Sequence, residues 1–193
     1  MSDECVFDLK ADPEKFNVVY AGNIGKMQNV ELIANTAKKY EIDKSIHYYI
    51  IGEGANRPQV ESIVHDLDNV TLLPMQKAIY AESIYAQADA NLIPLAKGGI
   101  KTALPSKIAT ILRTGKNAIF CIDKNSKFEE IIKASDNVRI SDNNDPASLY
   151  EVICSLRDNA CNKRKEEENK EFFSLFSYKN SERYVDIIES MVL

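Results

Sequence analysis

The sequence predicts an α/β protein, with a Rossmann-like parallel sheet of six strands and helices on both faces. Short, nearly continuous apolar runs of strand length alternate about six times with longer segments whose apolar residues recur at helical spacing. Strands that are apolar throughout need cover on both faces, and parallel sheets wound with helices provide it. The chain has 193 residues, which suits one domain of this kind.

The expected strands end at glycine, proline or polar residues, and they cover residues 17–21, 47–51, 69–73, 90–93, 118–122 and 138–140. The expected helices cover residues 28–40, 57–66, 77–88 and 106–114. Gly115 suits the left-handed position that ends the last of these. A further helix is expected after Ser126, where Glu129 completes a capping box, and another after Asp145, which precedes Pro146 as an N-cap.

The ends of the chain differ from the middle. Residues 1–15 are acidic, lack an apolar signal core and are interpreted as the remnant of an interdomain linker. Residues 16–160 form the predicted Rossmann-like domain. Residues 161–193 are expected to form C-terminal helices, which pack on the domain or on a missing N-terminal domain through an aromatic cluster of Phe172, Phe173 and Phe176.

Composition excludes several classes of partner. The net charge is −5 and the pI is near 5.2, which disfavours binding to nucleic acid. No apolar run is long enough for a transmembrane segment, so a cytoplasmic protein is predicted, with peripheral contact at the inner membrane expected only through the missing domain. The four cysteines form no C-x-x-C pair and are interpreted as reduced structural thiols, so no metal or cofactor is predicted.

Ligands of open parallel sheets bind beyond the carboxyl ends of the strands, where the strand order reverses. With the strand order 3-2-1-4-5-6, the loops at that point are Gly22–Lys26 and Pro94–Thr102. They contain Gly22, Gly25, Gly98 and Gly99, together with three lysines. Glycine allows close approach of a ligand and lysine suits phosphate, although such glycines can simply form turns. There is no G-x-G-x-x-G fingerprint and no Walker A motif.

Several motifs occur in an order that resembles a known family. They are Tyr20–Gly25, Ile50–Gly54, Asn69–Pro74, Ala88–Pro94 and Leu104–Lys107 before Gly115. This order is similar to the C-terminal domain of retaining GT-B glycosyltransferases that build bacterial capsule, exopolysaccharide and lipopolysaccharide. The likeness covers roughly residues 16–190. It implies that the chain is one half of a GT-B fold and that it binds a UDP- or GDP-linked sugar donor. It also implies an N-terminal acceptor domain or separate subunit, and a reaction without an obligatory metal.

The resemblance implies a set of nucleotide-sugar-binding residues: Gly22, Asn23, Gly25, Lys26, Gly52, Gly54, Met75, Gln76, Ile100, Lys101, Thr102, Ser106 and Lys107. Two departures from the family pattern matter. Many members carry an arginine and a lysine in the first loop, where this chain has Asn23 and Gln28. Many also carry two glutamates at the positions of Thr102 and Thr110, so no catalytic residue is assigned.

These observations favour the donor-binding domain of a glycosyltransferase that extends a surface polysaccharide or a lipid-linked acceptor. Two alternatives stay open. One is a non-catalytic nucleotide-binding or interaction module descended from such a domain. The other is half of a different Rossmann-like enzyme, such as a GT-B epimerase. The sequence does not distinguish an excised domain from a natural half that pairs with a separate subunit.

Overall fold

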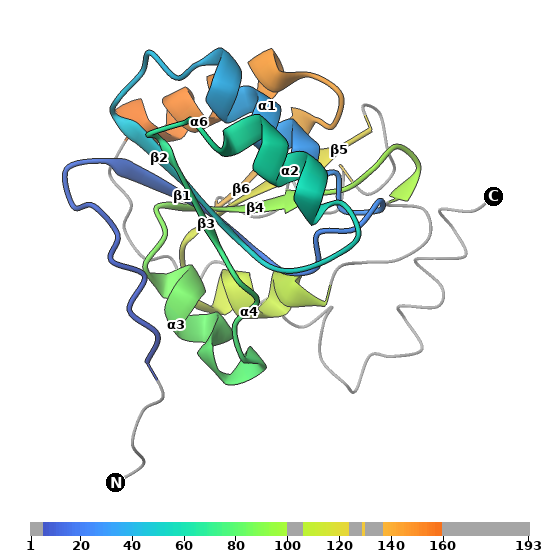
Figure 1. Cartoon of the computed structure of the whole chain (residues 1–193). Coiled ribbons are helices and arrows are strands. Elements are labelled where there is room, and N and C mark those ends of the chain that lie inside the picture. The colour runs from blue at the N-terminus through green and yellow to red at the C-terminus, as the bar shows by residue number, and fades with distance from the viewer. Residues whose placement is uncertain (1–5, 100–105, 124–128, 130–136, 160–193) are drawn as a thin grey trace, which may run out of the picture.

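The fold was analysed in a computed structural model that describes residues 6–99, 106–123, 129 and 137–159. Its centre is a six-stranded sheet with the order β3-β2-β1-β4-β5-β6 (Figure 1). Every neighbouring pair of strands is parallel. The predicted fold class and strand order are therefore confirmed, and the order reverses between β1 and β4 as expected.

The strands lie close to their predicted positions. Their bounds are β1 Phe16–Ala21, β2 Ile46–Ile51, β3 Val70–Leu73, β4 Ala90–Pro94, β5 Asn117–Ile122 and β6 Val138–Asp142. Strands β1, β4 and β5 are buried almost throughout. This burial agrees with their continuous apolar sequences, because helices cover a parallel sheet on both faces.

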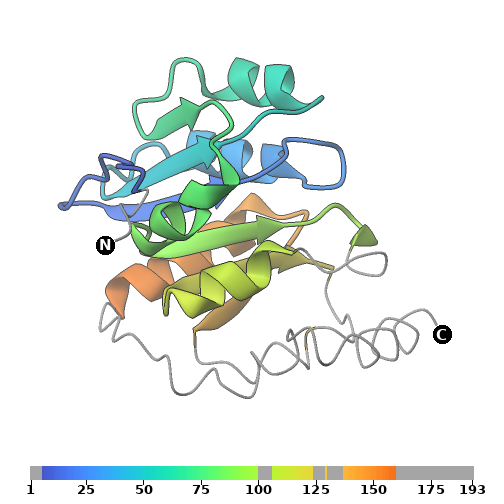
Figure 2. The ribbon, with the colours of Figure 1, turned by 90° about the horizontal axis from the view of Figure 1, so that it is seen from below.

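Helices form one layer on each side of the sheet (Figures 1 and 2). Helices α1 (Val30–Lys39), α2 (Arg57–Val64) and α6 (Pro146–Asp158) pack on one face, over a core that includes Tyr48 and Ile153. The short helix η1 (Ala78–Tyr80) and helices α3 (Ala81–Ala86) and α4 (Lys107–Arg113) cover the other, over a core that includes Phe120. The described part of the chain contains no helix long and apolar enough to cross a membrane.

Two predicted helix boundaries are confirmed by their local geometry. Gly115 follows α4 with a φ of 69°, the left-handed conformation that glycine adopts without a Cβ clash. At the start of α6, the Asp145 carboxylate accepts a hydrogen bond of 2.9 Å from the backbone N–H of Ala147, and Pro146 follows the cap. The capping box that begins at Ser126 lies outside the described residues, apart from Glu129.

The segment predicted as a linker lies against α3 over the residues that the structure describes. The backbone N–H of Phe7 donates to Ser83, and that of Leu9 donates to Gln87 at 2.8 Å. Leu9 is buried in the core on this side of the sheet. The predicted C-terminal helices in residues 161–193 fall outside the described residues, so the proposed division of the chain into domains stays a prediction.

Candidate functional site

A pocket of about 490 Å³ opens at the carboxyl ends of β1 and β4, where the strand order reverses. Both glycine- and lysine-containing loops contribute to it, as the sequence predicts. Its wall also includes residues of α3 and the start of α4. The lining residues are Tyr20, Ala21, Gly22, Asn23, Met27, Gln28, Tyr85, Pro94, Leu95, Gly99, Ser106 and Lys107.

Among the described residues that line this pocket, the cation is Lys107, the first residue of α4. Its Nζ atom donates a hydrogen bond of 3.3 Å to the carbonyl oxygen of Ala21 and lies 4.1 Å from the centre of the Tyr20 ring. Lys107 is half-buried in the pocket wall, and burial lowers the pKa of its ammonium group to about 7. An anion entering the pocket would favour the charged form, since an opposite charge nearby raises the pKa of a lysine.

Tyr20 forms part of the pocket wall, next to the Lys107 ammonium group. Burial raises the pKa of its hydroxyl well above the usual range, so the hydroxyl stays protonated and donates to the carbonyl oxygen of Asn23. The Lys107 ammonium lies over the electron-rich face of the Tyr20 ring, which is a cation–π arrangement. Tyr20 thus contacts both the Lys107 ammonium group and the backbone of the first loop at Asn23.

The first loop carries amides where many relatives are expected to carry cations. Asn23 and Gln28 both line the pocket, and the Nδ2 atom of Asn23 donates to Oε1 of Gln28 at 3.2 Å. Lys26 is exposed and lies outside the pocket lining. Among the described residues of the pocket wall, the positive charge therefore comes from Lys107 on α4 and not from the first loop.

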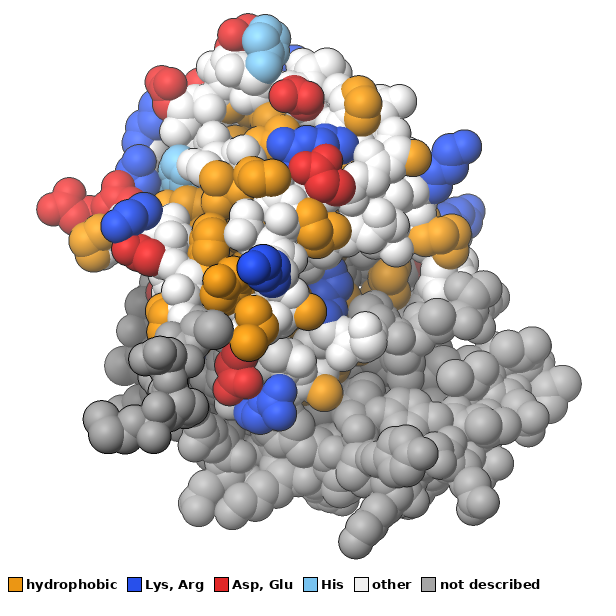
Figure 3. All heavy atoms as spheres, turned by 60° about the horizontal axis from the view of Figure 1, so that its bottom comes forward, with side chains coloured by type: hydrophobic (Ala, Val, Ile, Leu, Met, Phe, Trp, Pro, Cys, Tyr) orange, Lys and Arg blue, Asp and Glu red, His pale blue; other side chains and the backbone are white. Residues whose placement is uncertain are grey.

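A second, smaller pocket of about 190 Å³ adjoins the first and shares Ala21, Gly22 and Tyr85 with it. Met75 and Gln76, predicted to lie near a nucleotide base, form part of its wall. Hydrophobic side chains gather on this side of the molecule (Figure 3). Met75, in the wall of the smaller pocket, is 45% exposed.

Gly52 and Gly54 line neither pocket, and their role in the fold is packing between loops. A Cβ atom on Gly52 would overlap the carbonyl oxygen of Gly22, and one on Gly54 would overlap that of Ile24. These contacts let the loop after β2 lie directly against the loop after β1, where the N–H of Ile24 donates to the carbonyl oxygen of Glu53 at 2.7 Å. Because these two glycines have no Cβ atom, the first loop can lie in its observed position against the loop after β2.

The structure thus brings together part of the predicted residue set. Gly22, Asn23, Ser106 and Lys107 line the larger pocket, and Met75 and Gln76 line the smaller one. Gly25 and Lys26 belong to the first loop without lining the larger pocket. Ile100, Lys101 and Thr102 lie outside the described residues.

Sequence reasoning missed several residues of the pocket wall, chiefly Tyr20 and Tyr85. Tyr20 stands next to last in its strand, and that place at the carboxyl edge could have identified it. Tyr85 is the next-to-last residue of α3, and its pattern alone indicates only a core residue. Within the described residues no cluster of three or more His, Cys, Asp or Glu side chains could hold a metal ion.

The parallel sheet, with a pocket at the switch point, defines a Rossmann-like α/β domain. The family described as "Glycosyl transferases group 1" matches residues 15–159. This chain belongs to the group 1 glycosyl transferases.

Among curated proteins, the putative colanic acid biosynthesis glycosyl transferase WcaI of Escherichia coli K12 is 22% identical over 142 residues. That match covers 72% of this chain and 34% of the relative, so the chain spans about a third of the relative's length.

Solved structures share the fold at low sequence identity. The C-terminal domain of the group 1 glycosyl transferase LpcC from Francisella tularensis has a TM-score of 0.63 and 16% identity, covering 86% of this chain and 87% of that domain. Anabaena HepE, solved in complex with UDP and glucose, has a TM-score of 0.68 and 10% identity. The likeness covers 92% of this chain and 49% of HepE. Glycosyltransferase structures of the GT-B type therefore contain a domain with this fold.

Proposed function

We propose that this chain is the donor-binding domain of a retaining glycosyltransferase and that it binds a nucleotide-diphosphate sugar in the pocket at the β1–β4 switch point. The observation that carries the proposal is the half-buried ammonium of Lys107, which lines a pocket between two glycine-containing loops. Stabilising a leaving diphosphate is an electrostatic task, and a preorganised cation out of bulk water performs it well. HepE, which shares this fold, binds UDP and glucose.

The arrangement suggests how the donor would lie. The diphosphate would meet Lys107 and the backbone of the first loop at Gly22. The base would enter the smaller pocket beside Met75 and Gln76, because this pocket adjoins the larger one at Gly22. The sugar would face the loop after β4. No metal is needed in this proposal, since the lysine supplies the charge.

The remaining parts of the reaction belong to a partner. We infer that an N-terminal acceptor-binding domain, in the same protein or in a separate subunit, closes over this pocket. The matched relative is about three times as long as the region shared with this chain, since the match covers 34% of it. Its printed name, which refers to colanic acid biosynthesis, supports a surface polysaccharide or a lipid-linked sugar as the acceptor.

A non-catalytic nucleotide-binding module is the second candidate. The observation in its favour is Thr110 on α4, which stands where many relatives are expected to carry a glutamate. Threonine cannot act as a carboxylate. Under this alternative the pocket would bind the nucleotide, and the chain would not support sugar transfer with any partner.

The first experiment is calorimetric titration of the full chain with UDP, GDP, ADP and their glucose conjugates. Binding of one nucleotide family with micromolar to millimolar affinity would support the donor domain and identify the base. Failure of all six ligands to bind would contradict the proposed site. Adding a candidate acceptor domain and acceptor then separates the two candidates, because only a glycosyltransferase would consume the donor.

A further inference from the structure

A chain of hydrogen bonds connects the two loops that line the larger pocket. One is the first loop, which extends over residues 22–28 after β1. The other is the described part of the loop after β4, residues 94–99, called the β4 loop. The side-chain amide of Asn29 donates to the carbonyl oxygen of Asn143 at 2.6 Å. The amide of Asn143 in turn donates to the carbonyl oxygen of Leu95 at 3.1 Å. Asn143 is only 3% exposed, so these hydrogen bonds are shielded from water.

Asp123, just beyond β5, extends this chain to the glycines of the β4 loop. Its Oδ1 atom accepts a hydrogen bond of 3.3 Å from the same Asn143 amide. Its Oδ2 atom accepts one of 2.6 Å from the backbone N–H of Gly98. Gly98 has a φ of 76°, a conformation that glycine tolerates readily. Neither Asn143 nor Asp123 lines the pocket itself.

Asn29 adopts an unusual conformation at its end of the chain. It precedes α1 in the position where asparagine usually caps its own helix, yet its side chain makes no capping hydrogen bond there. Its backbone is left-handed, with φ 44° and ψ 45°, which is uncommon for a residue with a Cβ atom. The amide instead reaches Asn143, which lies 114 positions away in the sequence.

We propose that Asn29, Asn143 and Asp123 are positioning residues, which hold the first loop and the β4 loop at the separation that a nucleotide diphosphate requires. This inference rests on the proposed function of the pocket. Among the described backbone contacts, the N–H of Ala96 also donates to the carbonyl oxygen of Met27 at 2.9 Å. The side chains of Asn29, Asn143 and Asp123 add hydrogen bonds that stabilise the same pair of loops. A site whose loops are already ordered binds more tightly, because less conformational entropy is lost on binding.

Three variants test the proposal. Asn29→Gly keeps the left-handed backbone without strain and removes the side chain with its amide donor. Asn143→Asp is nearly isosteric, but it replaces the donor with a carboxylate next to Asp123. Asn144→Asp is the matched control, because it makes the same chemical change one residue along, at an exposed side chain. The probe is whichever of UDP, GDP or ADP the unmodified chain binds.

We expect Asn29→Gly and Asn143→Asp to bind that nucleotide about 3- to 10-fold more weakly, because the first loses one hydrogen bond of the chain and the second loses the two donated by its amide. Asn144→Asp should bind it normally. Asn29→Gly should keep its melting temperature within about 2 °C, because relief of the left-handed strain offsets the lost hydrogen bond. The backbone amide of Gly98 should exchange its hydrogen about 3- to 10-fold faster in Asn29→Gly and in Asn143→Asp than in the unmodified chain.

Affinity in Asn29→Gly equal to that of Asn144→Asp would overturn the proposal, even if Asn143→Asp failed to fold. Unchanged hydrogen exchange at Gly98 in Asn29→Gly would also overturn it. If the unmodified chain binds none of the three nucleotides, the proposed function fails, and the positioning role fails with it. Binding by the unmodified chain with no difference among the variants would remove the positioning role alone.

Discussion

The Nζ atom of Lys107 lies 4.1 Å from the centre of the Tyr20 ring, although the two residues are far apart in the sequence. The contact joins the start of α4 to the carboxyl end of β1, on the floor of the pocket. It holds a cation in the pocket wall, to which the first loop contributes the amides Asn23 and Gln28 but not Lys26. The proposed chemistry of the site therefore depends on a side chain supplied by a different segment of the chain.

Replacing Lys107 with alanine should weaken binding of the nucleotide diphosphate by about 1–3 kcal/mol, or roughly 5- to 150-fold, because a charge-assisted hydrogen bond is lost. Calorimetric titration measures the change. Lys26→Ala is the control, since Lys26 is exposed and lies outside the pocket lining. The sequence predicts a similar loss for both lysines. Equal losses would show that the first loop shares the role, and unchanged affinity in both would exclude the proposed phosphate site.

Binding of the diphosphate should also depend on pH. Burial lowers the pKa of Lys107 in the free protein to about 7, so above that pH the neutral amine must take up a proton when the anion binds. Affinity should therefore fall above pH 7, by up to about tenfold per pH unit. Titrations in two buffers with different ionisation enthalpies should reveal proton uptake at pH 8. The same uptake in Lys107→Ala would rule out this lysine as its source.

The lowered pKa has a separate effect on the free protein. The folded-state pKa of Lys107 lies below its value of 10.5 in the unfolded chain, so the unfolded state binds more protons between about pH 7 and 10.5. This lysine should make the free protein more stable as the pH rises through that range. The free energy of unfolding in urea at pH 7 and pH 9 would measure it, and Lys107→Met should remove that contribution.

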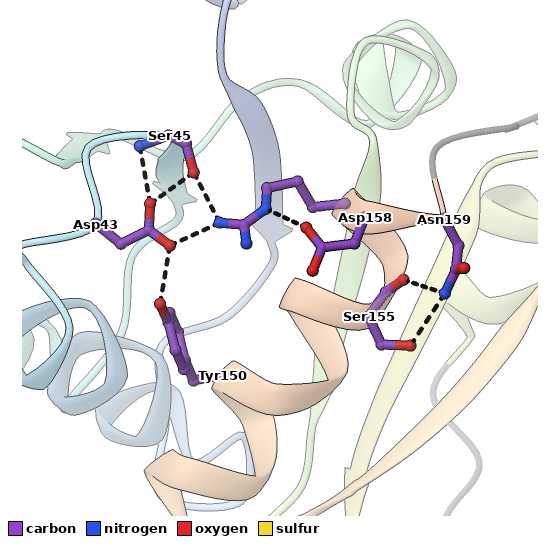
Figure 4. A network of polar contacts seen from close by, with 7 residues as sticks. Asp43, Ser45, Tyr150, Ser155, Asp158 and Asn159 are labelled. Atoms are coloured by element: carbon purple, nitrogen blue, oxygen red, sulfur yellow. Dashed lines mark hydrogen bonds and ion pairs between the residues drawn. The ribbon is translucent and has the colours of Figure 1, made fainter.

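A network of polar contacts fastens α6 to the turn before β2 (Figure 4). The Oδ2 atom of Asp43 accepts hydrogen bonds from Tyr150 at 2.8 Å and from Arg157 at 2.7 Å. Partial burial raises the pKa of Asp43, but hydrogen bonds from Ser45, Tyr150 and Arg157 outweigh it and lower that pKa to about 2. The carboxylate therefore stabilises the fold above pH 4, and this stabilisation should be lost as the pH falls from 4 to 2.

Asp43→Asn should lower the free energy of unfolding at pH 7 by about 1–2 kcal/mol, allowing for screening by solvent. Urea denaturation at pH 7 and at pH 2.5 should show a large difference between the two proteins only at the higher pH. Asp158→Asn is the control, because its side chain is 65% exposed although it also contacts Arg157. A loss in the control as large as that in Asp43→Asn would contradict the assigned role of Asp43.

Gly52→Ala should destabilise the domain, since the new Cβ would overlap the backbone carbonyl oxygen of Gly22. Backbone atoms cannot move aside as a flexible side chain can, so we expect a loss of about 2 kcal/mol or more in the free energy of unfolding. Gly98→Ala provides the comparison. Its Cβ would meet no atom within 4 Å, and only its left-handed φ of 76° disfavours alanine, by about 1 kcal/mol. Similar losses in both would argue against the close contact at Gly52.

The sequence predicts most of the fold because its signals are local. Continuous apolar runs mark β1, β4 and β5, and turn residues mark where they end. Gly115 and Asp145 mark the boundaries of α4 and α6 through their own backbone and side-chain chemistry. Rules on the winding of parallel sheets then leave few strand orders, and the one expected is observed.

The sequence by itself also determined where a ligand pocket should open, since the carboxyl ends of β1 and β4 meet wherever this strand order is adopted. Only the tertiary structure decided which side chains share that pocket. Lys107 faces the pocket over Tyr20, while Lys26 stays exposed, and Asn29 reaches Asn143 across the molecule. Such contacts depend on how separate loops pack against one another, and no local pattern of residue types encodes that packing.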